Sequence, residues 1–306
     1  MKVLLATQKP FAPVAVKGIR EILEGAGHNV VLLEKYENQS DFVTAVSDAD
    51  AVIVRSDKVT AEVIAAAPKL KIVVRAGAGY DNVDLAAATA HGIVVMNTPG
   101  QNSNAVAELA VALMLYMARN RFSPSTGSEL AGKTFGSHAF GHIGSLVCRK
   151  AEALGMSVKA VGHNPAVPDK IIAAGVTPAK SVAELYSTCD YVAINVPATS
   201  ETIGTIGYDL ISLMPKGATL INTARKEVID EGGLEKALEE RPDLKYATDV
   251  APDNYQTLCE KFGDRVYATP KKMGAQTSEA NINAGLAAAR QISDFFATGC
   301  IKFKVN

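Results

Sequence analysis

The chain has 306 residues, of which 48% are hydrophobic and 21% charged, a composition typical of a globular protein whose length suits two domains. Its formal net charge of -1 gives no electrostatic reason to expect a nucleic-acid or anionic-membrane partner. The four cysteines lie far apart without metal-ligand spacing, and the short apolar start of the chain is typical of a first strand rather than a signal peptide. We therefore expect a cytoplasmic protein without a metal site.

Residues 1–100 repeat one pattern of apolar strand, turn and amphipathic helix. Helices are expected, for example, at Ala15–Gly25 and Thr60–Ala66. The alternation predicts a parallel sheet with helices on both faces. The expected strands are Val3–Ala6, Val30–Leu33, Ala51–Val54, Ile72–Val74 and Ile93–Met96.

A long helix is expected from Asn104 to Arg119, and its nearly continuous apolar content predicts burial on all sides. A linker at Phe122–Gly127 then leads into a second strand-and-helix series, which ends in a long helix at Ser278–Ala297 that should return to the first domain. The strands of this series are expected at Thr134–Ala139, Ser157–Val161, Tyr191–Val196, Thr219–Asn222, Tyr246–Val250 and Val266–Ala268. The pattern predicts an α/β protein with two Rossmann-like, doubly wound parallel-sheet domains and a cleft between them: residues 1–100 plus 280–306, and residues 101–279.

The segment Gly132–Met156 has the pattern strand, glycine turn, helix. Gly141 and Gly144 would let the backbone approach a pyrophosphate at the helix N-terminus, with His142 beside it. The G-x-G-x-x-G pattern is broken because Ala139 replaces the first glycine, and the acid expected about 20 residues later is missing. By itself, the segment fits a nucleotide site and an ordinary strand-to-helix turn equally well.

Arginines follow three of the expected strands. Arg55 and Arg75 end neighbouring strands, where they either clamp a phosphate or carboxylate or remain solvated charges. The small residues after Arg75 leave the backbone amides of Gly77 and Ala78 open for an anion. Arg225, after the strand GATLIN, either binds a substrate carboxylate or forms a structural ion pair.

Polar residues also follow the last two strands. Asp249 ends a buried strand and can accept a hydrogen bond from a nicotinamide amide or cap a helix. Lys271 and Lys272 lie in the run Thr269–Ala275 and form either a basic surface turn or a general base. A lysine can act as a base only if burial or neighbouring cations, here Arg225, lower its pKa.

Several motifs, in this order along nearly the whole chain, resemble those of the D-isomer-specific 2-hydroxyacid dehydrogenases. The motifs are VRS at Val54–Ser56, RAGAGYDNVDL at Arg75–Leu85, GIVVMNTPGQNS at Gly92–Ser103, AELA at Ala107–Ala110, INTAR…VIDE at Ile221–Glu231 and TDV at Thr248–Val250. The resemblance implies hydride transfer between NAD and a 2-hydroxy or 2-keto acid, and a homodimer. It is strongest to the members that oxidise 3-phosphoglycerate in serine biosynthesis, so that reaction is expected.

The resemblance also implies roles for individual residues. Residues 1–100 plus 280–306 would bind substrate and residues 101–279 the dinucleotide, while Arg225 would orient the substrate carboxylate and hydroxyl. The implied substrate contacts are Arg55, Ser56, Arg75, Gly77 and Ala78. The implied cofactor contacts are Ala78, Gly141, His142, Ile143, Gly144, Gly162, His163, Asn164, Val196, Pro197, Thr223, Ala224, Asp249, Gly274 and Ala275.

Two departures from the family affect catalysis. The segment that carries the family's catalytic histidine, P-H-x-G-A, is PKKMGA here and one residue longer. Counting from the proline selects Lys271 as the acid/base, counting back from the glycine selects Lys272, and the first count is preferred. The family's carboxylate, 29 residues after the catalytic arginine, is replaced by Asn254. That carboxylate normally keeps a histidine protonated, so it is less needed beside a lysine.

Two further departures concern the cofactor and regulation. The family's ribose-binding aspartate falls at Gly162, followed by His163 and Asn164. An acid there would repel a 2′-phosphate, so its absence admits NADP as an alternative to NAD. The chain also ends without the C-terminal regulatory domains of longer relatives, so serine feedback through such a domain is not expected.

Two other functions fit the same residues. A hydroxypyruvate or glyoxylate reductase would share the fold and Arg225 but bind no phosphate. A nucleotide-sensing binding protein, related to the corepressors of the family, would bind the cofactor without turnover.

Overall fold

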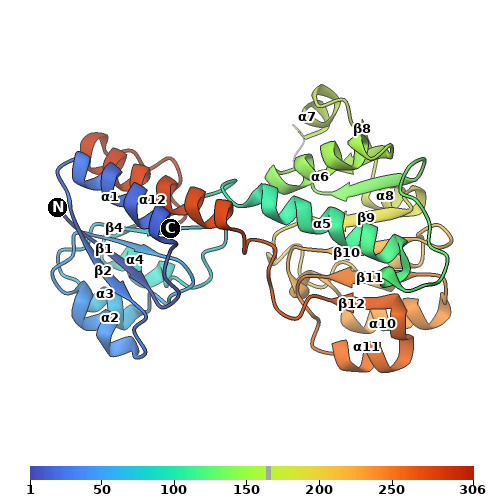
Figure 1. Ribbon diagram of the computed structural model, residues 1–306, viewed down its shortest axis with the longest axis horizontal. Helices are drawn as coiled ribbons and strands as arrows, with labels where there is room; N and C mark the ends of the chain where they lie inside the picture. Colours follow the sequence, from blue (N-terminus) through green and yellow to red (C-terminus); the bar gives the residue numbers. More distant parts are fainter. Residues whose placement is uncertain (163–166) are drawn as a thin grey trace. The chain divides into compact units, whose positions relative to one another are not determined.

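The computed structural model describes residues 1–162 and 167–306. It divides into two compact units, which we call unit 1 (Met1–Asn102 and Ala275–Asn306) and unit 2 (Ser103–Gly274). Unit 1 is discontinuous because its last helix, α12 (Ser278–Thr298), packs beside its first helix, α1 (Pro13–Gly25) (Figure 1). The predicted cofactor contacts His163 and Asn164 lie outside the described residues.

Unit 1 is built on a five-stranded parallel sheet. Its strands are β1 (Lys2–Thr7), β2 (Asn29–Glu34), β3 (Ala51–Val54), β4 (Ile72–Arg75) and β5 (Val94–Asn97). They lie in the order β2-β1-β3-β4-β5, with parallel neighbours throughout. The order reverses between β1 and β3, as in flavodoxin-like doubly wound sheets.

Helices cover both faces of this sheet. On one side α1 and α12 pack on Val3 and Leu5 of β1, and on the other Leu4 and Ala6 join the core beneath the remaining helices. Alternate residues of a strand face opposite sides, so a strand covered on both faces is apolar at successive positions. The remaining helices are α2 (Gln39–Val46), α3 (Ala61–Ala65) and α4 (Leu85–Ala90).

Unit 2 is built on a seven-stranded parallel sheet. Its strands are β6 (Thr134–His138), β7 (Ser157–Val161), β8 (Thr177–Pro178), β9 (Tyr191–Ile194), β10 (Thr219–Asn222), β11 (Lys245–Thr248) and β12 (Val266–Ala268). Their order is β12-β11-β10-β9-β6-β7-β8. The order reverses between β6 and β9, which is the arrangement of dinucleotide-binding folds and places a ligand crevice beyond the end of β6.

Two cores lie on opposite faces of this second sheet. The helices of unit 2 are α5 (Ser103–Ala118), α6 (His142–Ala153), α7 (Val167–Ala173), α8 (Val182–Thr188), α9 (Tyr208–Ile211), α10 (Glu231–Glu240) and α11 (Tyr255–Phe262). Phe135, Ala193 and Ile221 belong to the core beneath α5 and α6, whereas Val192 and Tyr246 belong to the core beneath α8–α11. Short 3₁₀ turns span Asn120–Phe122, Lys226–Val228 and Gly263–Arg265. Among the described residues, no helix is both long and apolar enough to cross a membrane.

The prediction that the helix now seen as α5 is buried on all sides is wrong. Met114 and Met117 are buried, but Glu108, Ala112 and Leu115 are exposed, Leu115 to 39%. The described chain packs α6 and strands of the unit 2 sheet against one side of α5, while the apolar sequence continues onto the other side. The continuous apolar sequence of α5 therefore did not indicate which sides of this helix other elements of the same chain cover.

Candidate active site

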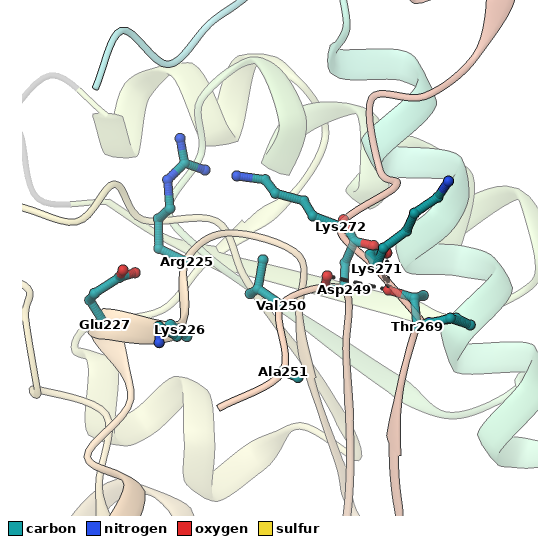
Figure 2. Close-up of a pocket in the computed structure, with 10 residues that line it drawn as sticks. Arg225, Lys226, Glu227, Asp249, Val250, Ala251, Thr269, Lys271 and Lys272 are labelled. Atoms are coloured by element: carbon teal, nitrogen blue, oxygen red, sulfur yellow. Dashed lines mark hydrogen bonds between the residues drawn. The ribbon is translucent and has the colours of Figure 1, made fainter. Parts of the chain in front are cut away.

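A pocket of about 360 Å³ lies beyond the C-terminal ends of β10, β11 and β12 (Figure 2). Ligands of open α/β sheets bind at this edge, outside the carboxyl ends of the strands. The pocket brings together four residues that the sequence singled out: Arg225, Asp249, Lys271 and Lys272. The complete lining is Arg225, Lys226, Glu227, Asp249, Val250, Ala251, Thr269, Pro270, Lys271 and Lys272.

Asn222, the last residue of β10, fixes the backbone that carries Arg225. The Asn222 side chain accepts a hydrogen bond from the Ala224 amide (3.0 Å) and donates one to the Arg225 carbonyl (2.9 Å). The Arg225 Nη1 donates to the Ala224 carbonyl (2.9 Å). Because Asn222 has no exposed surface, this turn is held from inside the protein. Its buried side chain therefore sets the point from which Arg225 enters the pocket.

Asp249 joins the end of β11 to the turn that carries the lysines. Its Oδ1 accepts hydrogen bonds from the Thr269 hydroxyl and the Met273 amide, and its Oδ2 accepts one from the Gly274 amide, all at 2.8 Å. Asp249 is 2% exposed, so these donors compensate for the loss of water around a buried carboxylate. Asp249 therefore does not cap a helix; it anchors both ends of the segment that contains Lys271 and Lys272.

The two lysines point in different directions from this turn. Figure 2 shows the Lys272 side chain reaching toward Arg225, while Lys271 extends away from Arg225. Lys226, next to Arg225, forms an ion pair with Asp253. The pocket therefore has two cationic side chains, Arg225 and Lys272, directed toward one another.

Asn254 does not line this pocket. Its side chain donates to the Glu231 carbonyl (3.4 Å) and to Glu235 Oε2 (3.3 Å), and its backbone amide donates to Glu231 Oε2 (3.1 Å). These partners lie in α10, so the Asn254 side chain holds the start of α11 against α10. The residue at the position of the family's carboxylate therefore has structural partners of its own.

The turn between β6 and α6 has the form expected of a pyrophosphate site. Gly141 is the N-cap of α6 and has no side chain with which to cap it, and among the described residues a Cβ added to Gly141 would meet nothing within 4 Å. A Cβ at Gly144 would lie 2.2 Å from the Ala139 carbonyl oxygen, so only glycine allows this close approach. Open amides at the N-terminus of a helix suit an anion, so these residues fit the phosphates of a dinucleotide.

Gly162, at the end of β7, occupies the position of the missing acid. A Cβ there would lie 2.2 Å from Cγ1 of Val167, the first residue of α7. An aspartate would therefore require α7 to shift. The remaining predicted cofactor residues follow strand ends: Val196 and Pro197 after β9, Thr223 and Ala224 after β10, and Gly274 and Ala275 after β12.

Arg55, at the end of β3 in unit 1, is already engaged by the protein. Its Nη1 donates to the carbonyls of Lys9 (2.9 Å) and Pro10 (3.2 Å), and its Nη2 donates to Asn281 Oδ1 (2.5 Å). The guanidinium also lies over the Phe11 ring, 5.2 Å from its centroid, and burial lowers its pKa. Arg55 therefore ties the loop after β1 and the start of α12 to the sheet.

The turn after β4 is compact because glycine is present. Gly77 has φ +150°, and a Cβ on it would lie 1.5 Å from Nη1 of Arg75. The Ala78 carbonyl accepts a hydrogen bond from Asn97 Nδ2 (2.6 Å), and the Gly77 carbonyl accepts one from the Thr98 amide (2.9 Å). The guanidinium of Arg75 is thus folded against the small residues predicted to bind an anion, while Ser56 is exposed.

Sequence reasoning missed part of the pocket. Lys226 and Glu227 line it directly after Arg225, and Thr269 lines it while donating to Asp249. The sequence pattern could have indicated Thr269, because a hydroxyl at the end of an apolar strand needs a buried hydrogen-bond partner. Lys226 and Glu227 are surface-type residues that nothing in the sequence pattern distinguishes.

Comparison with known proteins shows that the chain is similar to dehydrogenases. The family model described as D-isomer specific 2-hydroxyacid dehydrogenase, catalytic domain, matches residues 5–306. A crystal structure of NAD⁺-bound 3-phosphoglycerate dehydrogenase from Entamoeba histolytica is 49% identical, covers 100% of this chain and 98% of that chain, and has a TM-score of 0.88.

Longer curated proteins are also similar in sequence to this chain. D-3-phosphoglycerate dehydrogenase of Methanocaldococcus jannaschii is 38% identical over 83% of this chain and 51% of its own length. The human D-3-phosphoglycerate dehydrogenase is 34% identical over 90% of this chain and 54% of its own length. The chain therefore spans about half the length of the curated relatives it matches.

Replacing Asp249 by alanine should release the turn that carries the lysines. The change leaves the Met273 and Gly274 amides without their acceptor, while the Thr269 hydroxyl keeps the Lys271 carbonyl (2.9 Å) as an acceptor. We expect it to lower the free energy of unfolding by roughly 2–4 kcal/mol. Urea unfolding measures this loss, and hydrogen exchange should become faster at the Met273 and Gly274 amides. Asp264→Ala is the matched control: the Asp264 side chain is 91% exposed, and its loss should cost less than about 1 kcal/mol. Unchanged exchange at both amides in Asp249→Ala would contradict the anchoring role.

Proposed function

The chain belongs to the D-isomer specific 2-hydroxyacid dehydrogenase family, and on this basis we propose that it oxidises 3-phosphoglycerate with NAD. The observation that carries the proposal is the directed pair of Arg225 and Lys272 in a pocket beyond β10–β12. The 49% identity to a 3-phosphoglycerate dehydrogenase, over nearly the full length of both chains, supports the choice of substrate.

In this proposal Arg225 binds the substrate carboxylate and the C2 oxygen. A guanidinium offers planar, paired donors that suit a carboxylate, and its backbone is fixed by Asn222. The neutral amine of Lys272 takes the proton of the C2 hydroxyl, while the C2 hydride leaves with its electron pair and the C2–O bond becomes a carbonyl. A lysine that accepts a proton must be in its neutral form, which burial or neighbouring cations favour in proteins. We therefore assign the proton transfer to Lys272 rather than to Lys271, and we assign no catalytic step to Asn254.

The cofactor would bind along the C-terminal edge of the unit 2 sheet. Gly141–Gly144 would hold its pyrophosphate, and Asp249 Oδ2, which accepts the Gly274 amide, has lone-pair capacity for the amide of the nicotinamide. When bound, the nicotinamide supplies the hydride acceptor. NAD is the proposed cofactor, and NADP is the alternative because Gly162 carries no charge.

Unit 1 would supply the phosphate site. Arg55 and Arg75 follow the adjacent strands β3 and β4 and provide two cations for the 3-phosphate, with the Gly77 and Ala78 amides available to the carboxylate. Arg55 also holds the loop after β1, so its role would be shared between structure and binding. We further propose that the reaction serves L-serine biosynthesis in the cytoplasm.

A homodimer formed through unit 2 is also proposed. Support comes from the exposed side of α5, where Leu115 is 39% exposed, and from the shallow apolar groove that Val111 and Leu154 line nearby. Association of two copies would remove this apolar surface from water.

Changes at the two lysines test the assignment of the base. We expect Lys272→Ala to lower the rate of hydride transfer by at least about 100-fold, in the range of general acid–base catalysis, and Lys271→Ala by less than about fivefold. Lys272→Arg keeps the charge but cannot accept a proton at neutral pH, so it should be as slow as Lys272→Ala. The measurement is the rate of reduced-cofactor formation in single turnovers. A rate loss under tenfold for both alanine variants would refute a lysine base, and a loss at Lys271 alone would reverse the assignment.

A second test compares 3-phosphoglycerate with unphosphorylated glycerate. Arg75→Gln should raise KM for 3-phosphoglycerate by roughly 10- to 100-fold, because charge-assisted hydrogen bonds to the phosphate are lost, and should change KM for glycerate by less than about threefold. Steady-state kinetics with both substrates measures the difference. Equal losses with both substrates would contradict a phosphate site at Arg75, and wild-type turnover that is insensitive to the phosphate would favour a hydroxypyruvate or glyoxylate reductase.

The dimer is tested by placing a charge on α5. Leu115→Glu should convert the dimer to a monomer in sedimentation velocity, because a carboxylate would be buried in an apolar interface. Leu213→Glu is the control, since Leu213 is 44% exposed elsewhere on unit 2 and the change should leave the dimer intact. A dimer that persists in Leu115→Glu would exclude this side of α5 as the interface.

A further inference from the structure

Ser137 is a polar residue at a buried position of β6, where an apolar residue would be expected. It is fully buried, with no exposed surface, two residues before the turn that leads to α6. Apolar side chains of neighbouring strands surround this part of the sheet. A buried hydroxyl must find partners or cost free energy, so the partners of Ser137 identify what it does.

The first partner of Ser137 lies in the turn itself. The Ser137 hydroxyl donates to the carbonyl of Ala139 at 2.7 Å. Ala139 has φ +90°, a left-handed conformation that glycine adopts readily and a residue with a Cβ does not. In this chain alanine stands where the family's fingerprint has its first glycine. The hydrogen bond therefore holds the one residue of the turn whose backbone is strained.

The second partner is Asn195, which directly follows β9. Its Nδ2 donates to Ser137 Oγ (3.0 Å) and to the Ala193 carbonyl (3.3 Å). The carbonyls of Ala193 and Ala139 can only accept, so the directions are fixed: Asn195 donates to Ser137, and Ser137 donates to Ala139. The strands on both sides of the reversal point of the sheet are thus joined to the turn by one hydrogen-bonded chain.

The turn tolerates little displacement. The Cα of Gly144 in α6 approaches so closely that a Cβ would lie 2.2 Å from the Ala139 oxygen and 2.7 Å from Ser137 Oγ. If the Ala139 carbonyl rotated away from Ser137, the approach of α6 to the strand would change with it. The open amides at the start of α6 depend on this approach.

We propose that Ser137 and Asn195 are positioning residues that hold the Ala139 turn in its cofactor-binding conformation, in place of the missing glycine. The inference rests on the proposed function for its ligand, a nicotinamide dinucleotide whose pyrophosphate binds at Gly141–Gly144. It predicts a specific dependence: Ser137 matters because residue 139 is alanine, and it should cease to matter when residue 139 is glycine.

A double-mutant cycle tests this dependence. Ser137→Ala should weaken NAD binding by about 5- to 10-fold, measured as Kd by isothermal titration calorimetry, because one buried hydrogen bond no longer stabilises the turn. Ala139→Gly should bind at least as tightly as the wild type. The double variant should bind within about twofold of Ala139→Gly alone. Ser187→Ala, which removes an exposed hydroxyl bonded to the Glu184 carbonyl, is the matched control and should change nothing.

A second measurement on the free protein separates this inference from the proposed function. The Ala139 amide donates to the Val161 carbonyl (3.0 Å), and its hydrogen exchange should be faster in Ser137→Ala and should return to the rate of Ala139→Gly in the double variant. If the wild type bound neither NAD nor NADP, the proposed function would fail, while the exchange result would still decide whether Ser137 holds the turn. An unchanged exchange rate in Ser137→Ala, or a loss of NAD affinity that Ala139→Gly does not restore, would overturn the inference.

Discussion

The pocket of unit 2 depends on one buried carboxylate. Asp249 accepts three hydrogen bonds from the segment that follows β12, and this segment carries both lysines of the pocket. Behind it, the Asn222 carbonyl accepts hydrogen bonds from the Thr248 hydroxyl and the Asp249 amide, both at 2.9 Å. The ends of three adjacent strands are therefore connected by polar groups that are almost completely buried. Desolvation makes each of these bonds expensive to break, so the turn is held more firmly than surface loops usually are.

This construction explains how two cations can be directed toward one another. Two cationic side chains do not attract one another, so Arg225 and Lys272 do not point toward one another because of their own charges. Their positions are instead imposed by backbone turns that Asn222 and Asp249 hold from within the protein. The orientation of both side chains is therefore set by the fold before any ligand binds.

The sequence predicted the architecture and the convergence of Arg225, Asp249 and the lysine pair, because strand ends in a parallel sheet meet at one edge. The sequence did not predict in which direction each side chain points at that edge, or with which groups it forms hydrogen bonds. Two counts through PKKMGA gave two different lysines, since neighbouring residues in a turn point in different directions and only the anchoring by Asp249 settles which one approaches Arg225. The sequence positions of Asn254 and Arg55 suggested a catalytic and a substrate-binding role, respectively, yet their hydrogen bonds go to α10 and to the loop after β1. Continuous apolar sequence in α5 predicted burial but could not indicate that one side remains uncovered.

The division of the chain has a consequence for the order in which the protein is built. Unit 2 is one continuous stretch, whereas unit 1 is completed by α12, which is synthesised more than 170 residues after the end of β5. During translation the strands of unit 1 leave the ribosome before α12. The sheet face that α1 and α12 cover together is therefore only partly covered until unit 2 has emerged. The part of the protein that is made first is therefore the last to be finished. The apolar sheet face that α12 later covers is therefore the surface most prone to aggregation while the chain is still being synthesised.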